Sequence, residues 1–384
     1  MRHVIQLVCL ALLALPAGAE KRTTVAQLEQ ELAAARARHK TDEDIANRLQ
    51  GMGLSERLTE ITLERLEGTL KPDPKAAQAL RLLADQSMFL EPPASELPAT
   101  ATPDAAAQQK MLAAARSYVE KVLPGLPNFL ATRTINRFDD SPYSQQRGGW
   151  GVRDGLHLVD TTNHRISVLD ERENQPPTQG SAIWRKEFGL ISGGEFGSTL
   201  GMILTDTAQG KVAWSHWEQS PAGPVAVFAY SVPREASHFF VIGLKENVDR
   251  VGLGSVTRGS APSPVGVQPG DVTNTTTYMT RPAYYGSLWL DPETGTILRI
   301  TIESSAKDGA PFRRAGIMVE YGPVEIDGSK FICPIRSLAF SVAVPDPHAY
   351  LSDAATEWLN ETLFTGYHRF GSTTRIITDT PVPQ

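Results

Sequence analysis

The chain has 384 residues, of which 41% are hydrophobic and 21% are charged, and its formal net charge is −6. This composition is ordinary for a globular protein, and the length allows two or three domains. The acidic balance argues against binding to nucleic acids or to anionic membranes, because both need basic surfaces.

The N-terminus has the pattern of a secretory signal peptide. Arg2 supplies a positive start, residues 4–15 form an apolar run too short to span a bilayer, and residues 17–19 fit the small-x-small cleavage rule. Cleavage after Ala19 is therefore expected, with Glu20 as the first residue of an exported protein in the periplasm or outside the cell. No membrane-spanning segment is predicted in the mature chain.

The chain contains two cysteines. Cys9 lies inside the apolar run rather than after it, which argues against a lipoprotein acylated at that residue. Signal cleavage leaves Cys333 as the sole cysteine, so no intramolecular disulfide is possible. Cys333 is expected to be a small buried residue within a strand.

Residues 20–90 are predicted to be mostly helical, because apolar residues recur every three or four positions among polar ones. Thr41 and the carboxylate three residues later form a capping-box sequence at the start of a helix at residues 43–50. Pro74 can begin a further helix at residues 75–86. These helices are expected to pack on one another.

Residues 105–384 are predicted to form an antiparallel β-sheet domain, joined to the helices by a Pro-rich linker at residues 91–104. This domain opens with a helix at residues 105–122, and a second helix at 195–208 is expected to cover part of the sheet. Residues 247–277 are interpreted as a mobile loop over the sheet edge. Strands are predicted at residues 129–138, 152–159, 165–169, 212–218, 225–232, 238–244, 276–285, 286–290, 296–303, 317–324, 331–342 and 362–377, with a turn at 160–163.

Two hairpins give the clearest local signals. Residues 291–295 (Asp-Pro-Glu-Thr-Gly) and 327–328 (Asp-Gly) are turn sequences between strand-like runs. After the first turn, Leu298, Ile300 and Ile302 alternate with polar residues, which predicts one apolar and one polar face. The polar residues are Arg299, Thr301 and Glu303.

The sequence Trp-Ser-His-Trp-Glu forms the densest unusual cluster. Regular alternation would place Trp214, His216 and Glu218 on one face of a strand and Ser215 and Trp217 on the other. Three interpretations stay open: core packing, an aromatic lining of a ligand-facing surface, and an acid/base pair. The third would need a nucleophile or oxyanion donors that converge on the pair.

Common catalytic and cofactor motifs are absent. The chain has no G-x-S-x-G elbow, Walker A loop, G-x-G-x-x-G fingerprint or H-E-x-x-H helix. No catalytic residue, cofactor or metal is therefore assigned from the sequence.

Two resemblances accompany these patterns. The mature chain resembles an uncharacterised family of exported bacterial proteins through residues 54–58, 84–90, 126–129, 214–218 and 324–328. The β region is similar to the lipoprotein-carrier proteins of the LolA and LolB type, through a helix, a Leu-Pro-Asn-Phe entry to the first strand and a meander with a Leu-Asp-Pro-Glu-Thr-Gly hairpin. This second resemblance implies a curved, incomplete barrel whose apolar concave face is closed by helices and carries acyl chains.

The sequence thus predicts an α+β fold, with a helical N-terminal region followed by a curved antiparallel sheet and one or two covering helices. The preferred function is non-catalytic binding of a lipid or another hydrophobic or amphiphilic ligand on the concave face. A filled core is the alternative role for the apolar residues. Other hypotheses are a protein-interaction module of the cell envelope and a hydrolase using His216 and Glu218. The candidate ligand-lining residues are Trp214, Trp289, Leu298, Ile300 and Ile302.

Overall fold

The computed structural model describes residues 22–140, 155–169, 172–174, 190, 193–221, 223–247, 274–305, 312–343 and 357–370. The signal peptide predicted at residues 1–19 lies outside this part. So do residues 248–273 of the predicted loop, whose ends belong to two strands.

Four helices pack together at the N-terminal side: α1 (Val25–Ala37), α2 (Asp42–Gln50), α3 (Glu60–Leu70) and α4 (Pro74–Gln86). Each begins after a Thr or Asp side chain that accepts a hydrogen bond from the backbone N–H three residues on. Thr41 and Asp44 form the predicted capping box. The apolar faces meet in a core of their own that includes Leu28, Leu49 and Leu80. We call α1–α4 and the loops between them the helical bundle.

The chain then crosses to the sheet domain. Residues 87–104 contain only the short 3-10 turn η1 (Ala94–Glu96) as regular structure. The Glu96 carboxylate accepts hydrogen bonds from the hydroxyls of Thr59 and Thr62, so the first half of this segment is fixed to α3. Asp104 caps the next helix, α5 (Ala105–Gly125).

Ten strands form one antiparallel sheet in the order β3-β2-β1-β12-β11-β10-β9-β8-β5-β4. In the described part of the chain β3 and β4 are its two edges, so the sheet is open. A separate two-stranded sheet pairs β6 (Val241–Asn247) with β7 (Asn274–Thr280). The strands of the main sheet are β1 (Phe129–Asp139), β2 (His157–Leu169), β3 (Arg172–Asn174), β4 (Lys211–Ser220), β5 (Gly223–Val232), β8 (Tyr284–Leu290), β9 (Ile297–Ser305), β10 (Phe312–Ile326), β11 (Ser329–Ala343) and β12 (Glu357–Arg369).

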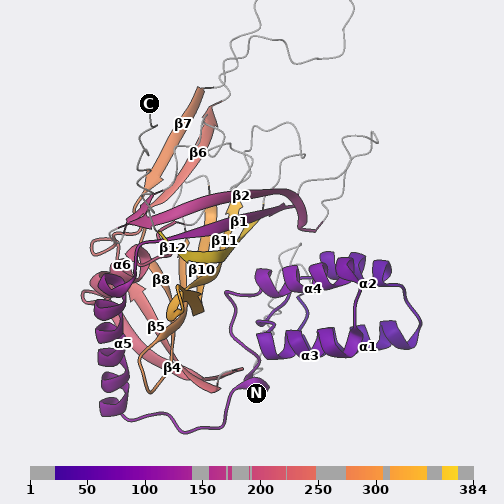
Figure 1. Ribbon diagram of the computed structural model, residues 1–384. Coiled ribbons are helices and arrows are strands. Elements are labelled where there is room, and N and C mark those ends of the chain that lie inside the picture. The colour runs from indigo at the N-terminus through magenta and orange to yellow at the C-terminus, as the bar shows by residue number, and fades with distance from the viewer. Residues whose placement is uncertain are drawn as a thin grey trace, which may run out of the picture.

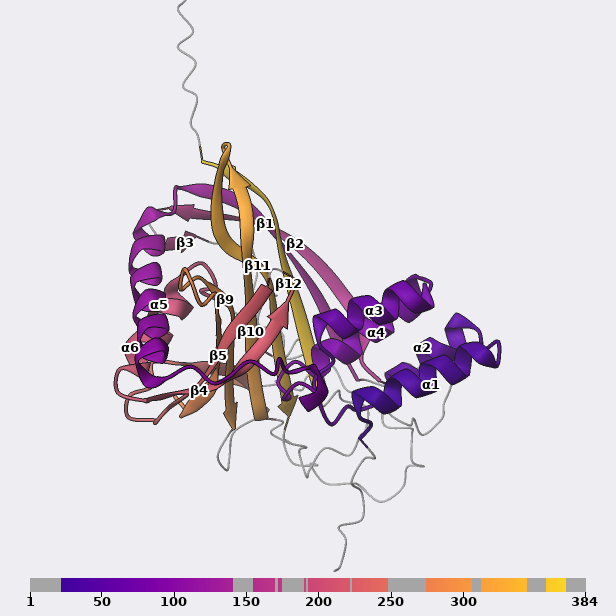
Figure 2. The ribbon, with the colours of Figure 1, turned by 90° about the horizontal axis from the view of Figure 1, so that it is seen from below.

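The main sheet is curved, with β1 and β2 arching over one end and β4 and β5 over the other (Figure 1). α5 and α6 (Ser198–Thr207) lie on its concave side, and the helical bundle lies on the convex side (Figure 2). This arrangement confirms the predicted fold class. None of the described helices is long and apolar enough to cross a membrane.

Both predicted hairpin turns are present. Asp327 and Gly328 have φ angles of 53° and 76°, the positive values that a tight hairpin turn requires. Asp291 Oδ1 accepts hydrogen bonds from the backbone N–H groups of Glu293 and Thr294 in the same turn, and Gly295 has φ 74°. A Cβ atom at Gly295 would lie 2.4 Å from the backbone of Ala114, so this turn abuts α5.

Several predicted boundaries were wrong. The turn predicted at residues 160–163 is part of the continuous strand β2, because its polar side chains bond to the neighbouring strand: Arg137 donates to Asp160 at 2.7 Å. α6 begins at Ser198 rather than at residue 195, after a glycine-rich approach. β12 begins at residue 357 rather than 362.

Candidate functional site

The five predicted lining residues lie on two different faces of the sheet. Ile300 and Ile302 are buried on the concave side in a core shared with α5 and α6, and Trp214 packs against that core. Trp289 and Leu298 belong instead to a small cluster with Val225 and Val227. That cluster is on the convex side, where Arg57 of the helical bundle lies over the Trp289 ring at 5.4 Å. The five residues therefore do not form one lining.

A β-bulge in β4 explains the position of Trp214. Trp214 pairs with Phe228 and His216 pairs with Val227, so Ser215 is an extra residue between two consecutive partners on β5. The extra residue shifts the alternation. Trp214 and Trp217 consequently meet edge to face on the concave side, with ring centroids 4.9 Å apart, while His216 lies on the convex side. The prediction that Trp214 shares a face with His216 was wrong.

A second bulge, in β9, places Leu298 and Ile300 on opposite faces of the sheet. Trp289 pairs with Arg299 and Leu290 pairs with Ile297, so Leu298 is the extra residue of β9. Leu298 therefore lies on the same side as Arg299, and Ile297 replaces it in the concave core. The predicted polar face is not solvated either, since Thr301 and Glu303 are buried.

The convex side carries a compact polar group centred on the Glu218 carboxylate. Glu218 Oε2 accepts hydrogen bonds from Arg57 Nη2 at 2.6 Å and from Trp289 Nε1 at 2.9 Å. His216 Nε2 lies 3.4 Å from the same oxygen, and His216 Nδ1 lies 2.9 Å from Ser215 Oγ. We call Arg57, Ser215, His216, Glu218 and Trp289 the convex cluster.

The surroundings of Glu218 keep it ionised. Burial by itself would raise the pKa of this carboxyl group, but hydrogen bonds from His216 and Trp289 and the charge of Arg57 outweigh it. The result is a pKa lowered to about 2. A carboxylate with so low a pKa is a poor general base near neutral pH, but it can orient a histidine and balance its charge.

A second guanidinium extends the convex cluster along the sheet. Arg299 lies over the Trp289 ring at 5.5 Å and its Nη2 is 2.7 Å from Glu320 Oε1. Glu60 of α3 approaches the same guanidinium at 3.9 Å. The Trp289 ring is thus in contact with one arginine from the helical bundle and one from the sheet.

The helical bundle is also attached to the sheet further along the convex face. Arg336 Nη2 lies 2.7 Å from both carboxylate oxygens of Asp85, and its Nε lies 2.8 Å from Glu361. Phe89 packs on the sheet where Gly316 has no side chain, since a Cβ atom there would lie 2.8 Å from the ring. Both contacts fix the end of α4 and the residues after it to the central strands.

The concave side is filled by the chain's own residues in the described part. α5 contributes Met111, Ala115 and Val119 to the core, and α6 contributes Leu200 and Ile203. They pack against inward-facing side chains of the strands, which include Phe228, Tyr230, Leu288, Ile300, Ile302 and Val319.

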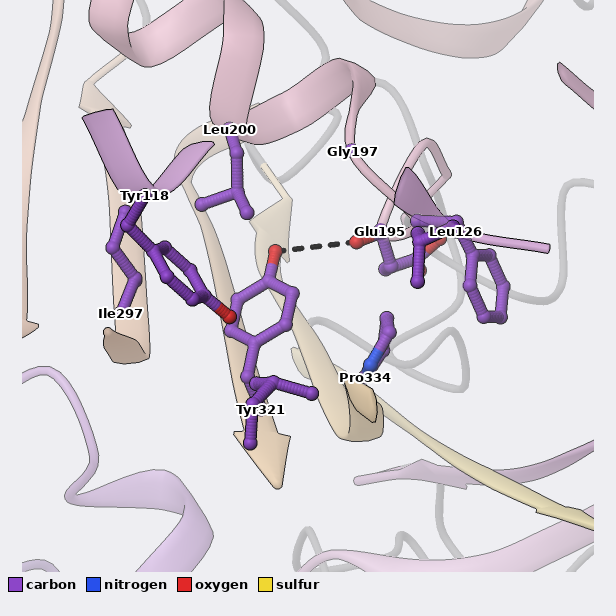
Figure 3. A pocket seen from close by; sticks show the side chains of 10 residues that line it. Tyr118, Leu126, Glu195, Gly197, Leu200, Ile297, Tyr321 and Pro334 are labelled. Carbon is purple, nitrogen blue, oxygen red and sulfur yellow. Dashed lines mark hydrogen bonds between the residues drawn. The ribbon is translucent and has the colours of Figure 1, made fainter. Parts of the chain in front are cut away.

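A small cavity lies at the end of α5 (Figure 3). It is bounded by Tyr118 of α5, Leu200 of α6, Ile297 of β9 and Tyr321 of β10. The Tyr321 hydroxyl points to the residues just before α6 and donates a hydrogen bond to the backbone carbonyl of Glu195 at 3.2 Å. The cavity volume is about 10 Å³, which is room for about one water molecule.

A buried ionic group lies beside this cavity. Arg133 Nη2 is 2.8 Å from Glu173 Oε1 and 3.1 Å from Glu195 Oε2, and the Arg133 and Glu195 side chains are almost completely buried. Ser337 Oγ also donates to Glu195, at 3.3 Å. These bonds fix the residues before α6 against β1 and β11, and they pair buried charges that would otherwise destabilise the fold.

The described residues give little support for a metal site or for an apolar docking surface on the helical bundle. No group of three or more His, Cys, Asp or Glu side chains among the described residues could hold a metal ion. The predicted apolar stripes of α1–α4 face into the core of the helical bundle, and Ile61 is the one large apolar side chain exposed on these four helices.

Comparisons of the chain with known protein families, with curated proteins and with solved structures found no match.

Sequence reasoning missed the roles of Arg57 and Ser215. Arg57 is in the loop between α2 and α3 and no local pattern relates it to the sheet. Ser215 was placed on the wrong face. The spacing of Trp214 and Trp217 was a usable signal, because two large aromatic residues three apart share a face of a strand only across a bulge.

Proposed function

We propose that the chain is an exported cell-envelope protein that binds a hydrophobic or amphiphilic ligand, such as a lipid acyl chain, on the concave face of the sheet. In the conformation described here, α5 and α6 occupy that face. The ligand would therefore take the place of α5, with Ile300 and Ile302 among its contacts.

The observation that carries this proposal is the way α5 covers the sheet. The helix buries Met111, Ala115 and Val119 against a much larger apolar surface contributed by strands of the main sheet. Its N-terminal end follows a segment without regular structure, and residues 126–128 join it to β1. Displacing α5 would open the apolar face and break no strand pairing.

The size of the cavity sets a condition on the mechanism. Pockets that hold small molecules have volumes of roughly 300–1,000 Å³, whereas the cavity beside Tyr118 has about 10 Å³. The described residues around this cavity leave no room for such a ligand, so the proposed binding uses a minor, open conformation. The apparent affinity is then reduced by the small fraction of molecules in that conformation, and loosening α5 should raise it.

The test is calorimetric titration of the full mature chain with palmitate. We expect weak saturable binding to the wild type and at least tenfold tighter binding to the double variant Met111→Ala/Val119→Ala. The matched control is Leu28→Ala/Leu49→Ala, which removes comparable apolar contacts from the core of the helical bundle. Equal gains in both double variants, or no saturable binding to any of the three proteins, would contradict the proposal.

A further inference from the structure

Three neighbouring side chains of the convex cluster are linked by hydrogen bonds. They have no role in the proposed binding of an apolar ligand. Ser215 Oγ is 2.9 Å from His216 Nδ1, and His216 Nε2 is 3.4 Å from Glu218 Oε2. The order is therefore hydroxyl, imidazole and carboxylate, which is the order of groups that activates a serine nucleophile.

The three groups also have the exposures that this chemistry needs. Ser215 is exposed, the His216 side chain is 15% exposed and the Glu218 side chain is 13% exposed. Arg57 and Trp289 hold the carboxylate in place from two other parts of the chain. The site thus combines an accessible hydroxyl, a partly enclosed imidazole and a carboxylate held in a fixed position.

The bulge is what brings the hydroxyl to the imidazole. In a regular strand, Ser215 and His216 would project from opposite faces, too far apart for a side-chain hydrogen bond. The extra residue in β4 re-aims Ser215, and bulges of this kind are over-represented next to active sites. β4 is also an edge of the described sheet, so some backbone N–H groups of this strand face away from β5, where they can donate to a developing oxyanion.

We propose that Ser215 is a catalytic nucleophile with His216 as its general base and Glu218 as a positioning residue, and that this site hydrolyses short-chain carboxylic esters. The acyl group is taken to be short because Ser215 is exposed and no residue of β4 is fully buried. This proposal is independent of ligand binding on the opposite, concave face.

The reaction balances without a cofactor. Ser215 Oγ attacks the ester carbonyl carbon while its proton moves to His216 Nδ1, and Nε2–H stays hydrogen-bonded to Glu218. Collapse of the tetrahedral adduct breaks the bond to the alkoxy oxygen, which leaves as the alcohol with the proton from His216. Water then attacks the acyl-serine and gives its proton to His216. The carboxylic acid leaves and the proton returns to Ser215 Oγ.

The first test is covalent labelling of the mature chain with a fluorophosphonate, followed by peptide mass spectrometry. We expect an adduct on Ser215 in the wild type and in Ser231→Ala, and none in Ser215→Ala. Ser231 is a matched control because it is an exposed serine on the adjacent strand β5. Absence of an adduct on Ser215 in the wild type overturns the proposal.

The second test is hydrolysis of 4-nitrophenyl acetate. The rate should fall at least roughly 100-fold in Ser215→Ala and in His216→Gln, as expected for loss of a nucleophile or a general base, and should be unchanged in Ser231→Ala. Glu218→Gln should lower kcat with little change in KM, and Glu218→Asp should restore part of it. A wild-type rate no higher than that of Ser215→Ala overturns the proposal.

Discussion

Arg57 Nη2 lies 2.6 Å from Glu218 Oε2, although the two residues are 161 positions apart in the chain. Their side chains are 3% and 13% exposed. This pair joins the helical bundle to the edge of the sheet, and it places a positive charge beside the carboxylate that faces His216. The same ion pair therefore helps to position the helical bundle and sets the charge around the convex cluster.

Removing Arg57 should destabilise the protein strongly. Arg57→Ala removes the closest cationic partner of the mostly buried Glu218 carboxylate, and losses of about 3–5 kcal/mol are typical when one member of a buried ion pair is removed. The matched control is Arg48→Ala. Its ion pair with Glu31 has a similar distance, 2.9 Å, but is exposed, so a loss of less than about 1 kcal/mol is expected. Urea unfolding of both variants measures the difference, and equal losses would show that the buried pair has no special role.

The low pKa of Glu218 predicts a loss of stability in acid. The pKa of this group is lowered in the folded protein from its usual value of 4.5 to about 2. Its contribution is therefore present above pH 4.5 and is lost as the pH falls towards 2. In Glu218→Gln the part of the acid-induced loss of stability that is due to protonation of Glu218 should disappear. Thermal unfolding at pH 3 and pH 6 tests it. An unchanged difference between the two pH values in the variant would contradict the assignment.

Asp85 should act in the opposite direction. Burial, with help from Glu361 and Glu320, raises the pKa of the Asp85 carboxyl group to about 6, although Arg336 opposes the shift. The folded protein thus binds this proton more tightly than the unfolded chain. The contribution of Asp85 to stability grows as the pH falls from about 7 towards 4.

Asp85→Asn tests this sign. The amide cannot titrate, so the stability of the variant should rise less than that of the wild type between pH 7 and pH 5. Urea unfolding at both pH values gives the comparison. If acidification within this range stabilises the variant as much as the wild type, Asp85 does not titrate as inferred.

Gly316 should not tolerate a side chain. An alanine Cβ atom there would lie 2.8 Å from the Phe89 ring, so Gly316→Ala should cost about 1–3 kcal/mol by overpacking. Gly68 provides the opposite control: it is exposed in α3 and has no other group within 4 Å of a Cβ atom. Gly68→Ala should stabilise by up to about 1 kcal/mol. Equal signs for the two variants would refute close packing of Phe89 on the sheet.

Export can be tested independently of the fold. If Ala19 precedes a signal cleavage site, intact-mass measurement of protein secreted by a bacterial host should give a mature chain that begins at Glu20. Ala19→Arg should leave the precursor uncleaved, whereas Glu20→Gln should be processed normally. Recovery of the full-length wild-type chain from the cytoplasm alone would contradict the prediction.

Local patterns in the sequence were sufficient for the elements themselves. The capping box at Thr41, the Asp327-Gly328 turn and the 291–295 turn depend on interactions between residues a few positions apart, and all three are present. Alternating and helical periodicities predicted the α+β class for the same reason. Boundaries were predicted less accurately, as in β2, because polar residues that resemble a turn are bonded to the neighbouring strand.

The composition of the candidate sites was decided by tertiary structure. Strand periodicity assigns faces correctly only while every residue has a partner, and the extra residues Ser215 and Leu298 shift the alternation in β4 and β9. The bulge in β4 moved Trp214 to the face opposite His216 and brought the Ser215 hydroxyl to the His216 ring. Arg57 reached Glu218 because the helical bundle packs on the convex face. The sequence by itself therefore determined the elements, through contacts between near neighbours, whereas strand pairing and packing between distant segments decided which side chains meet.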